Sequence, residues 1–297
     1  MRIASFLIAI LIFSQLGNII RFSEAHPITT TFWRLVIASL LLIPFVLYTK
    51  SYQQIKKLTL EHWRALAASA ALLFGTFTIY IYAIFETTVA EATLVFSLHP
   101  IITAILSYFF LKENVNMKTK GAIFLGCGAV FVVFAGNGQI GDGHILGALF
   151  ALFSAVTFSM FLIQAKKCRA VISNSLFTTL VFGGAAVCAG IMMLTMDLPF
   201  TGHSQQSWLT FAALAVFPTI LGHALFTHCL KYFSVNTVSC GIVANAPLAA
   251  LTAQVLFNET ITVNIIFATV LTTWAIMSLF IKIPIRIVDG KLVFTRA

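Results

Sequence analysis

The chain has 297 residues, of which 60% are hydrophobic and 9% charged, and its 18 basic and 9 acidic side chains give a net charge of +9. A soluble globular protein carries roughly 25% charged residues, so this composition excludes a water-soluble body. Because a helix needs roughly 20 apolar residues to cross a bilayer, about ten crossings and their short loops use the whole length.

Ten apolar segments follow one another along the chain. They cover residues 3–20, 28–48, 65–85, 92–111, 121–136, 145–163, 176–197, 208–230, 236–257 and 261–281. The runs are long, and backbone groups cannot stay unpaired in hydrocarbon, so each run is predicted to be a helix rather than a barrel strand. The fold class expected is therefore an all-α membrane protein with about ten transmembrane helices.

The basic residues sit in alternate loops between these segments. With the N-terminus inside, sixteen of the 18 Lys and Arg residues fall in inside segments, Arg21 falls outside, and Arg34 lies within the second apolar segment. Cytoplasmic loops of membrane proteins carry such an excess. The sequence therefore predicts a multi-pass protein of the cell inner membrane with both termini cytoplasmic. It also argues against nucleic acid as a partner, because the basic residues flank helices and form no continuous tract.

The chain repeats itself at an offset near 146 residues. Val89 corresponds to Val235, and Glu113, after the fourth segment, corresponds to Glu259, after the ninth. Each half holds five helices, an odd number, so the second half is expected to be inverted in the membrane relative to the first.

This symmetry defines the predicted domains, one five-helix repeat over 1–138 and an inverted five-helix repeat over 139–297. The prolines miss the offset by one residue, since Pro100 pairs with the position before Pro247. Inverted repeats are typical of secondary transporters, in which one set of contacts opens alternately to each side.

Two stretches resemble EamA transporters of the drug/metabolite transporter superfamily. The residues that carry the resemblance are His26-Pro27 with Arg34 and Pro44 in the second helix, and Gly222-His223, Leu230-Lys231-Tyr232, Pro247 and Glu259 in the eighth and ninth. The resemblance covers nearly the whole chain and implies ten helices in two inverted repeats around a central cavity. It also implies export of amino acids or related metabolites. The sequence departs from the family in its tenth helix, which lacks glycine over 262–276.

Arg34 is the first candidate substrate-binding residue. It stands seven residues into the second helix, about 10 Å below the membrane surface, where a charged side chain costs roughly 3 kcal/mol on insertion scales. One interpretation is that the guanidinium holds a substrate carboxylate or phosphate by paired hydrogen bonds. The other is that it caps carbonyl groups of a neighbouring helix or reaches outward to the membrane surface.

Five further polar residues inside apolar segments are candidate substrate ligands. They are His99, His223, Asn245, Tyr80 and Asn18. His99 precedes Pro100, and Asn245 precedes Pro247, at places where proline frees a backbone carbonyl. For each of the five the alternative is a structural contact between helices.

No metal site, cofactor or catalytic residue is expected. His223 and His228 lie five apart on one helix, about 140° around its axis, so they do not share a face. The sequence contains no phosphate-binding loop, no paired aspartates and no GxSxG segment.

The function predicted is a secondary transporter, with export favoured, of small metabolites such as amino acids, working by alternating access. The alternatives are a membrane-embedded enzyme acting on lipid-linked substrates, or a channel. The partners expected are a small-molecule substrate and the lipid bilayer. Protons or a counter-solute are alternative coupling partners, and a second copy of the chain is an alternative partner in a homodimer.

Overall fold

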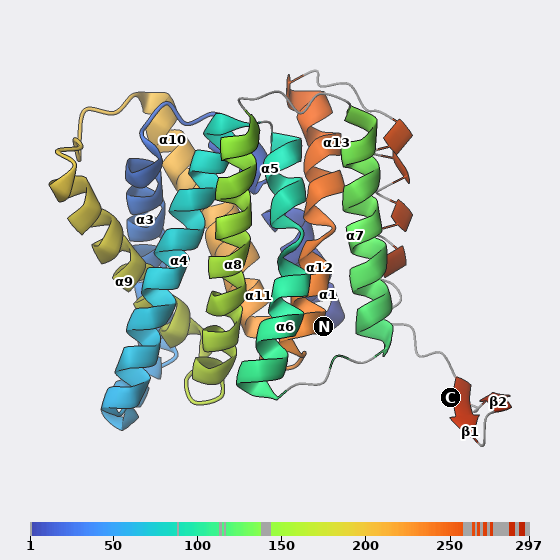
Figure 1. The fold of residues 1–297 in the computed structure, drawn as a ribbon. Coiled ribbons are helices and arrows are strands. Elements are labelled where there is room, and N and C mark those ends of the chain that lie inside the picture. Colours follow the sequence, from blue (N-terminus) through green and yellow to red (C-terminus); the bar gives the residue numbers. More distant parts are fainter. Residues whose placement is uncertain are drawn as a thin grey trace.

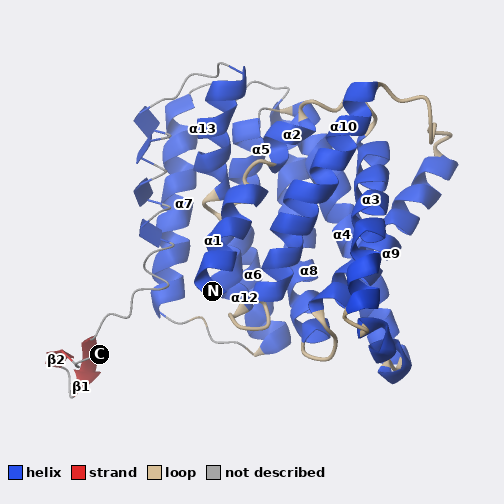
Figure 2. Cartoon of the chain, turned by 180° about the vertical axis from the view of Figure 1, so that it is seen from behind, coloured by secondary structure: helices blue, strands red, loops and turns tan. Residues whose placement is uncertain are grey.

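The computed structural model describes residues 2–87, 89–112, 115, 117–137 and 144–257, eight residues between 263 and 275, and 285–288 and 291–294. The described chain forms a bundle of long helices that run up and down side by side (Figure 1). Figure 2 gives the view from behind and shows that the bundle consists of helices joined by loops, with strands in the C-terminal hairpin. The predicted tenth helix, Glu113 and Glu259 lie largely or wholly outside the described residues.

The first half of the chain supplies seven α-helices and one short 3₁₀-helix. They are α1 (Arg2–Phe13), α2 (Leu16–Ile20), α3 (Pro27–Tyr48), η1 (Ser51–Lys57), α4 (Leu60–Glu86), α5 (Val89–Phe96), α6 (His99–Leu111) and α7 (Met117–Asn137). His26 caps the start of α3 by accepting the backbone N–H of Ile28, and Pro27 suits the first turn because that turn needs no N–H donor.

The second half supplies six α-helices, one π-helical segment and a hairpin. They are α8 (His144–Arg169), α9 (Asn174–Thr195), α10 (Gln205–Leu214), the π-helical segment η2 (Ala215–His223), α11 (Ala224–Cys229), α12 (Val235–Ile242) and α13 (Asn245–Phe257), followed by β1 (Ile285–Val288) and β2 (Lys291–Phe294). The antiparallel hairpin pairs Ile285 with Phe294, and it lies at the same end of the bundle as the start of α1 (Figures 1 and 2).

Length and apolar composition identify five described helices that are able to cross a membrane. They span Pro27–Tyr48, Leu60–Glu86, Ile145–Arg169, Asn174–Thr195 and Gln205–Cys229. Shorter apolar helices cover Ala4–Ile20 and His99–Leu111. The prediction of a helical membrane protein is therefore confirmed.

Nine of the predicted segments coincide with helices in the described part of the chain, but the hydropathy pattern misplaces several ends. The fifth, predicted as the shortest, is α7, which begins at Met117 rather than near Gly121. The sixth ends at Arg169 rather than near residue 163. The reason is that polar last turns such as Lys166 to Arg169 stay helical while lying outside the apolar stretch.

Several helices that the sequence predicts as continuous are interrupted. Residues 14–15 separate α1 from α2, residues 97–98 separate α5 from α6, and residues 243–244 separate α12 from α13. The last two breaks lie 146 residues apart, the offset of the sequence repeat, and both lie near mid-height of the bundle (Figure 1). Pro100 explains the start of α6, because its missing N–H fits only a first helical turn.

Basic side chains hold together one end of the bundle, called here the basic end, where α3, α6 and α8 finish (Figure 1). The Nζ of Lys166 donates to the carbonyl oxygens of Leu230 and Phe233, at 2.6 and 2.9 Å. Arg169 donates to the carbonyl oxygens of Thr227 and Ile172. These cations satisfy carbonyls at the end of α11, in the turn that follows it and in the turn after α8.

An aromatic cluster holds the opposite end. The indole Nε1 of Trp33 donates to the carbonyl of Phe200 at 2.9 Å, and its ring lies 4.7 Å from that of Trp208. Phe32 packs edge-on to Phe200 at 5.3 Å. The loop between α9 and α10 is thereby fixed against the first turns of α3.

Close helix packing around Gly241 generates a stability prediction. A Cβ atom at Gly241 of α12 would overlap Cζ of Phe6 in α1, a fully buried ring that also packs against Phe226 and Phe233. We expect Gly241→Ala to destabilise the protein by about 1–3 kcal/mol through overpacking. Thermal unfolding in detergent measures this change.

Gly128→Ala in α7 is the matched control, because no atom of the described residues lies within 4 Å of the Cβ it would add. Alanine there should stabilise the helix by up to about 1 kcal/mol. Equal melting temperatures for the two variants would contradict the packing described.

Candidate functional site

The most unusual buried group in the described chain is the guanidinium of Arg34. Its side chain is 0% exposed, and its Nε donates to Oγ1 of Thr219 in η2 at 2.5 Å. Its Cζ lies 3.8 Å from the centre of the Phe77 ring, a cation–π contact. Neither Nη1 nor Nη2 has a hydrogen-bond partner among the described residues. The guanidinium is therefore held at one nitrogen while its two terminal nitrogens remain available.

The π-helical segment η2 supplies the residue that orients Arg34. Pro218 lies inside η2 and cannot donate a backbone N–H, so the helix widens here instead of continuing with regular α turns. The hydroxyl of Thr219 donates to the carbonyl of Leu214 at 2.7 Å while it accepts from Arg34. The Thr219 hydroxyl thus satisfies the carbonyl of Leu214, to which Pro218 cannot donate a backbone N–H, and its oxygen accepts the hydrogen bond from Arg34.

His223, at the end of the same segment, lies in an aromatic pocket. It is 0% exposed, and its ring centre lies 5.0 Å from that of Phe161 and 5.4 Å from that of Phe77. Phe13, Phe158 and Phe182 add rings at 6.0 to 6.2 Å. Neither ring nitrogen has a partner in the described part of the chain. Arg34 and His223 thus lie against the same ring, that of Phe77, with unpaired polar atoms.

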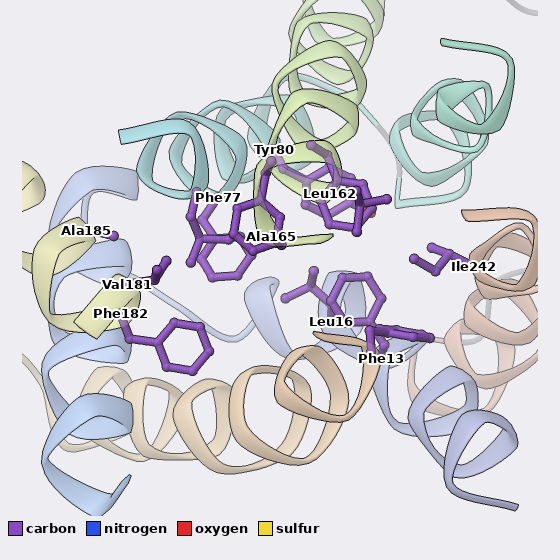
Figure 3. Packing of buried hydrophobic residues seen from close by; sticks show 14 of the residues in the cluster. Phe13, Leu16, Phe77, Tyr80, Leu162, Ala165, Val181, Phe182, Ala185 and Ile242 are labelled. Atoms are coloured by element: carbon purple, nitrogen blue, oxygen red, sulfur yellow. The ribbon is translucent and has the colours of Figure 1, made fainter. Parts of the chain in front are cut away.

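Figure 3 shows how aromatic rings from separate helices meet in this interior. Phe13 of α1, Phe77 of α4 and Phe182 of α9 all point inward from different sides. Phe13 and Phe77 also line a small cavity at the level of the helix breaks. Both rings also contact His223, and Phe77 contacts Arg34, so these rings adjoin the cavity and the two polar residues.

The cavity itself brings together two of the predicted ligands. Its walls include Tyr80 and Asn245, together with Ser14 and Thr93. The hydroxyl of Tyr80 bonds to that of Thr93 at 2.9 Å, whereas Oδ1 of Asn245 has no described partner. A volume of about 20 Å³ is enough for one water molecule and too small for a metabolite. The conformation described here is closed around the site.

His99 and Asn18 lie at the edge of this region and are partly committed to helix contacts. Nδ1 of His99 lies 2.9 Å from the carbonyl of Phe96, and its Nε2 is unpaired among the described atoms. Asn18 donates to the carbonyl of Ala249 at 3.1 Å and to Oγ1 of Thr252 at 2.7 Å. The amide of Asn18 thus joins α2 to α13, and its Oδ1 alone has no described partner.

Sequence reasoning missed the residues that position the predicted ones. Thr219 orients Arg34, Phe77 contacts Arg34, and both Phe13 and Phe77 line the cavity. Thr219 precedes His223 by four residues and follows Pro218, so the spacing could have placed it on the same helix face. Nothing distinguishes two functional phenylalanines among 29 in the sequence.

Comparison with known proteins gives a family match over almost the whole chain. The EamA-like transporter family matches residues 2–135 and 145–282. A solved structure described as "Crystal structure of protein" superposes with a TM-score of 0.77 and covers 93% of this chain and 95% of its own, at 18% identity. At that identity the superposition shows a shared fold.

Curated relatives are similar over much of their length. An uncharacterized transporter of Archaeoglobus fulgidus is 25% identical over 279 residues, which are 91% of this chain and 95% of the relative. An S-adenosylmethionine uptake transporter of Rickettsia prowazekii is 26% identical, over 80% of this chain and 77% of the relative. An uncharacterized transporter of Clostridium kluyveri is 24% identical, over 64% of this chain, and the match spans 62% of that relative.

The unpaired ring nitrogens of His223 are expected to lower the stability of the protein, a cost that a role in ligand binding would explain. Replacing His223 with Phe removes two buried polar atoms without partners and keeps a ring among the surrounding phenylalanines. We expect His223→Phe to stabilise the protein by about 1–3 kcal/mol. Thermal unfolding of the detergent-solubilised protein measures the shift.

Thr227→Val is the matched control, since it removes a buried hydroxyl that has partners, at 3.0 Å from Oδ1 of Asn174 and 2.9 Å from the carbonyl of Ala224. It should lower the melting temperature. A fall of the same size for His223→Phe would mean that the histidine contributes to the fold and is not kept for a ligand.

Proposed function

The chain belongs to the EamA-like transporter family, and on that premise we propose that it is a secondary carrier of small metabolites that bear a carboxylate, such as amino acids. The observation that carries the proposal is the guanidinium of Arg34, which is buried with Nη1 and Nη2 unpaired. An uncompensated charge in a membrane interior costs several kcal/mol, and a bound carboxylate accepting two parallel hydrogen bonds would offset that cost.

The surrounding residues support a substrate that is both polar and apolar. Arg34 takes the carboxylate, and His223, His99 and Asn245 offer unpaired polar atoms for a second polar group. The phenylalanine rings around His223 suit an apolar or cationic part of the same molecule. Tyr80, which lines the cavity, and Asn18, next to the lining residue Gly17, complete the proposed ligand set.

S-adenosylmethionine is a specific candidate within this class. Relatives from Rickettsia are named as its uptake transporters. The molecule carries a carboxylate that suits Arg34 and a sulfonium cation that suits the face of an aromatic ring. Uptake and counterflow assays with S-adenosylmethionine, amino acids, nucleosides and organic acids would identify the substrate.

The direction of transport is a separate part of the proposal. The resemblance to EamA exporters favours export, whereas the names of the Rickettsia relatives describe uptake. We place the protein in the inner membrane with both termini cytoplasmic, because sixteen of the 18 basic residues fall at one set of loops. Inside-out and right-side-out vesicles distinguish the two directions.

Alternating access between two inverted halves, 1–138 and 139–297, is the mechanism that we propose. It is supported by the mid-bundle breaks at residues 97–98 and 243–244, which share the 146-residue offset. Broken helices allow the two ends of a span to move separately with few backbone hydrogen bonds lost. The closed cavity of about 20 Å³ implies that such a movement precedes substrate binding.

The role of Arg34 is tested by Arg34→Lys, which keeps the positive charge but loses the planar guanidinium that can donate two parallel hydrogen bonds. We expect kcat/KM for carboxylate substrates to fall at least about tenfold, equivalent to about 1.4 kcal/mol, with normal membrane insertion. The control is Arg64→Lys at the exposed start of α4, which should transport normally. Wild-type transport by Arg34→Lys would show that the arginine is structural.

Alternating access predicts that α6 and α13 change their exposure in opposite senses when substrate binds. Single cysteines replace Ser107 of α6, at the basic end, and Thr252 of α13, toward the other end, in a protein without its five native cysteines. Substrate should raise labelling at one position and lower it at the other. Changes in the same sense at both positions would favour a channel.

A further inference from the structure

The two ring nitrogens of His223 are both unpaired among the described residues, which is unusual for a histidine with a structural role. Buried polar groups in proteins are nearly always hydrogen-bonded, yet both ring nitrogens of this fully buried side chain lack partners in the described chain. Its position at the end of η2 is set by the widened helix that also presents Thr219 to Arg34. One structural feature therefore places both groups against the ring of Phe77.

The surroundings of His223 contain one charged group among the described residues, and it is a cation. The elements packed around the imidazole contribute phenylalanines, namely Phe13 of α1, Phe77 of α4, Phe158 and Phe161 of α8 and Phe182 of α9. Arg34 of α3 lies against the same Phe77 ring, with its Cζ 3.8 Å from the ring centre. His99 lies beyond Phe158, with its ring centre 5.2 Å from that ring. No carboxylate from the described residues faces this group.

The charge balance of this pocket changes when an anion arrives. Without one, a protonated His223 would be a second buried cation beside Arg34, and two like charges in an apolar medium repel strongly. A carboxylate held by Arg34 neutralises the first charge and can accept a hydrogen bond from a protonated imidazole. Binding of the anion and binding of a proton therefore favour each other, and this coupling is reciprocal by thermodynamic linkage.

We propose that His223 binds one proton together with each carboxylate-bearing solute, so that the carrier moves both in the same direction. The inference rests on the proposed function. The proton comes from water on the side where the solute binds, forms one N–H bond on the imidazole ring, and returns to water on the side of release. No other bond forms or breaks, and a zwitterionic solute then carries one net positive charge across.

The test uses the full-length protein in liposomes that contain a pH-sensitive dye, with the membrane potential clamped by potassium and valinomycin. Radiolabelled L-methionine and S-adenosylmethionine are the probes. With an inward gradient of a probe, the wild-type interior should acidify by about one proton per solute. His223→Gln, which keeps a polar side chain but cannot be protonated, should move the solute more slowly and with at least about fivefold less acidification per solute.

His228→Gln is the matched control, because His228 lies on α11 with its ring 5.3 Å from that of Tyr232 and away from Arg34. Its proton-to-solute ratio should equal that of the wild type. Solute entry without acidification in the wild type, or an equal ratio in His223→Gln, would overturn the inference while leaving the carrier function intact. Absence of any radiolabel uptake by the wild type would contradict the proposed function itself.

A binding measurement keeps the inference testable if His223→Gln does not fold. The dissociation constant of the wild type for L-methionine should rise with pH by up to about tenfold per pH unit between about pH 5.5 and 8, where neither methionine group titrates. A dissociation constant that stays constant over this range overturns the inference.

Discussion

The structure depends on one positive charge enclosed in an apolar bundle. Arg34 lies on α3 against the ring of Phe77, with Thr219 as its hydrogen-bond acceptor. A guanidinium in such a place is costly unless an anion joins it, because the described interior supplies aromatic faces and no carboxylate. The wide turn of η2, the aromatic pocket of His223 and the closed cavity all lie around this charge. They are consistent with an interior adapted to receive an anionic group.

In the proposed mechanism, the helix breaks allow the substrate to reach Arg34. The 97–98 and 243–244 breaks lie near mid-height, where Asn245 and Tyr80 line the cavity. Both ends of the bundle are tied, by Lys166 and Arg169 at the basic end and by the Trp33 cluster at the other. These contacts are hydrogen bonds from cations or an indole N–H to carbonyl oxygens, and packing of ring against ring; none of them is a covalent bond or an ion pair. Opening one end while the other stays tied is therefore the movement that the contacts allow.

The sequence predicted the helical segments and the main polar residues, and physical reasons explain what it missed. Hydropathy locates apolar runs, so it found α3 and α9 closely but stopped short of the polar turn at Arg169. Arg34 and His223 were predictable because a charged or polar side chain in hydrocarbon needs a reason. Pro218 indicates an irregular helix, but a proline alone does not distinguish a kink from a π-helical turn, so the contact of Thr219 with Arg34 was not predicted. Asn18 illustrates the converse, since its amide N–H groups bond to α13 in a contact 231 residues away in sequence.

The most direct test of the account is a distance between Arg34 and a bound carboxylate. Solid-state NMR of the protein in lipid, with ¹⁵N in the guanidinium groups and ¹³C in the carboxylate of bound S-adenosylmethionine or methionine, measures it by dipolar recoupling. Arg34→Lys serves as the control that assigns the signal. The account predicts a nitrogen-to-carbon distance of about 4 Å, which corresponds to direct hydrogen bonds, and loss of the coupling in Arg34→Lys. A bound ligand whose carboxylate shows no coupling to Arg34 would contradict it.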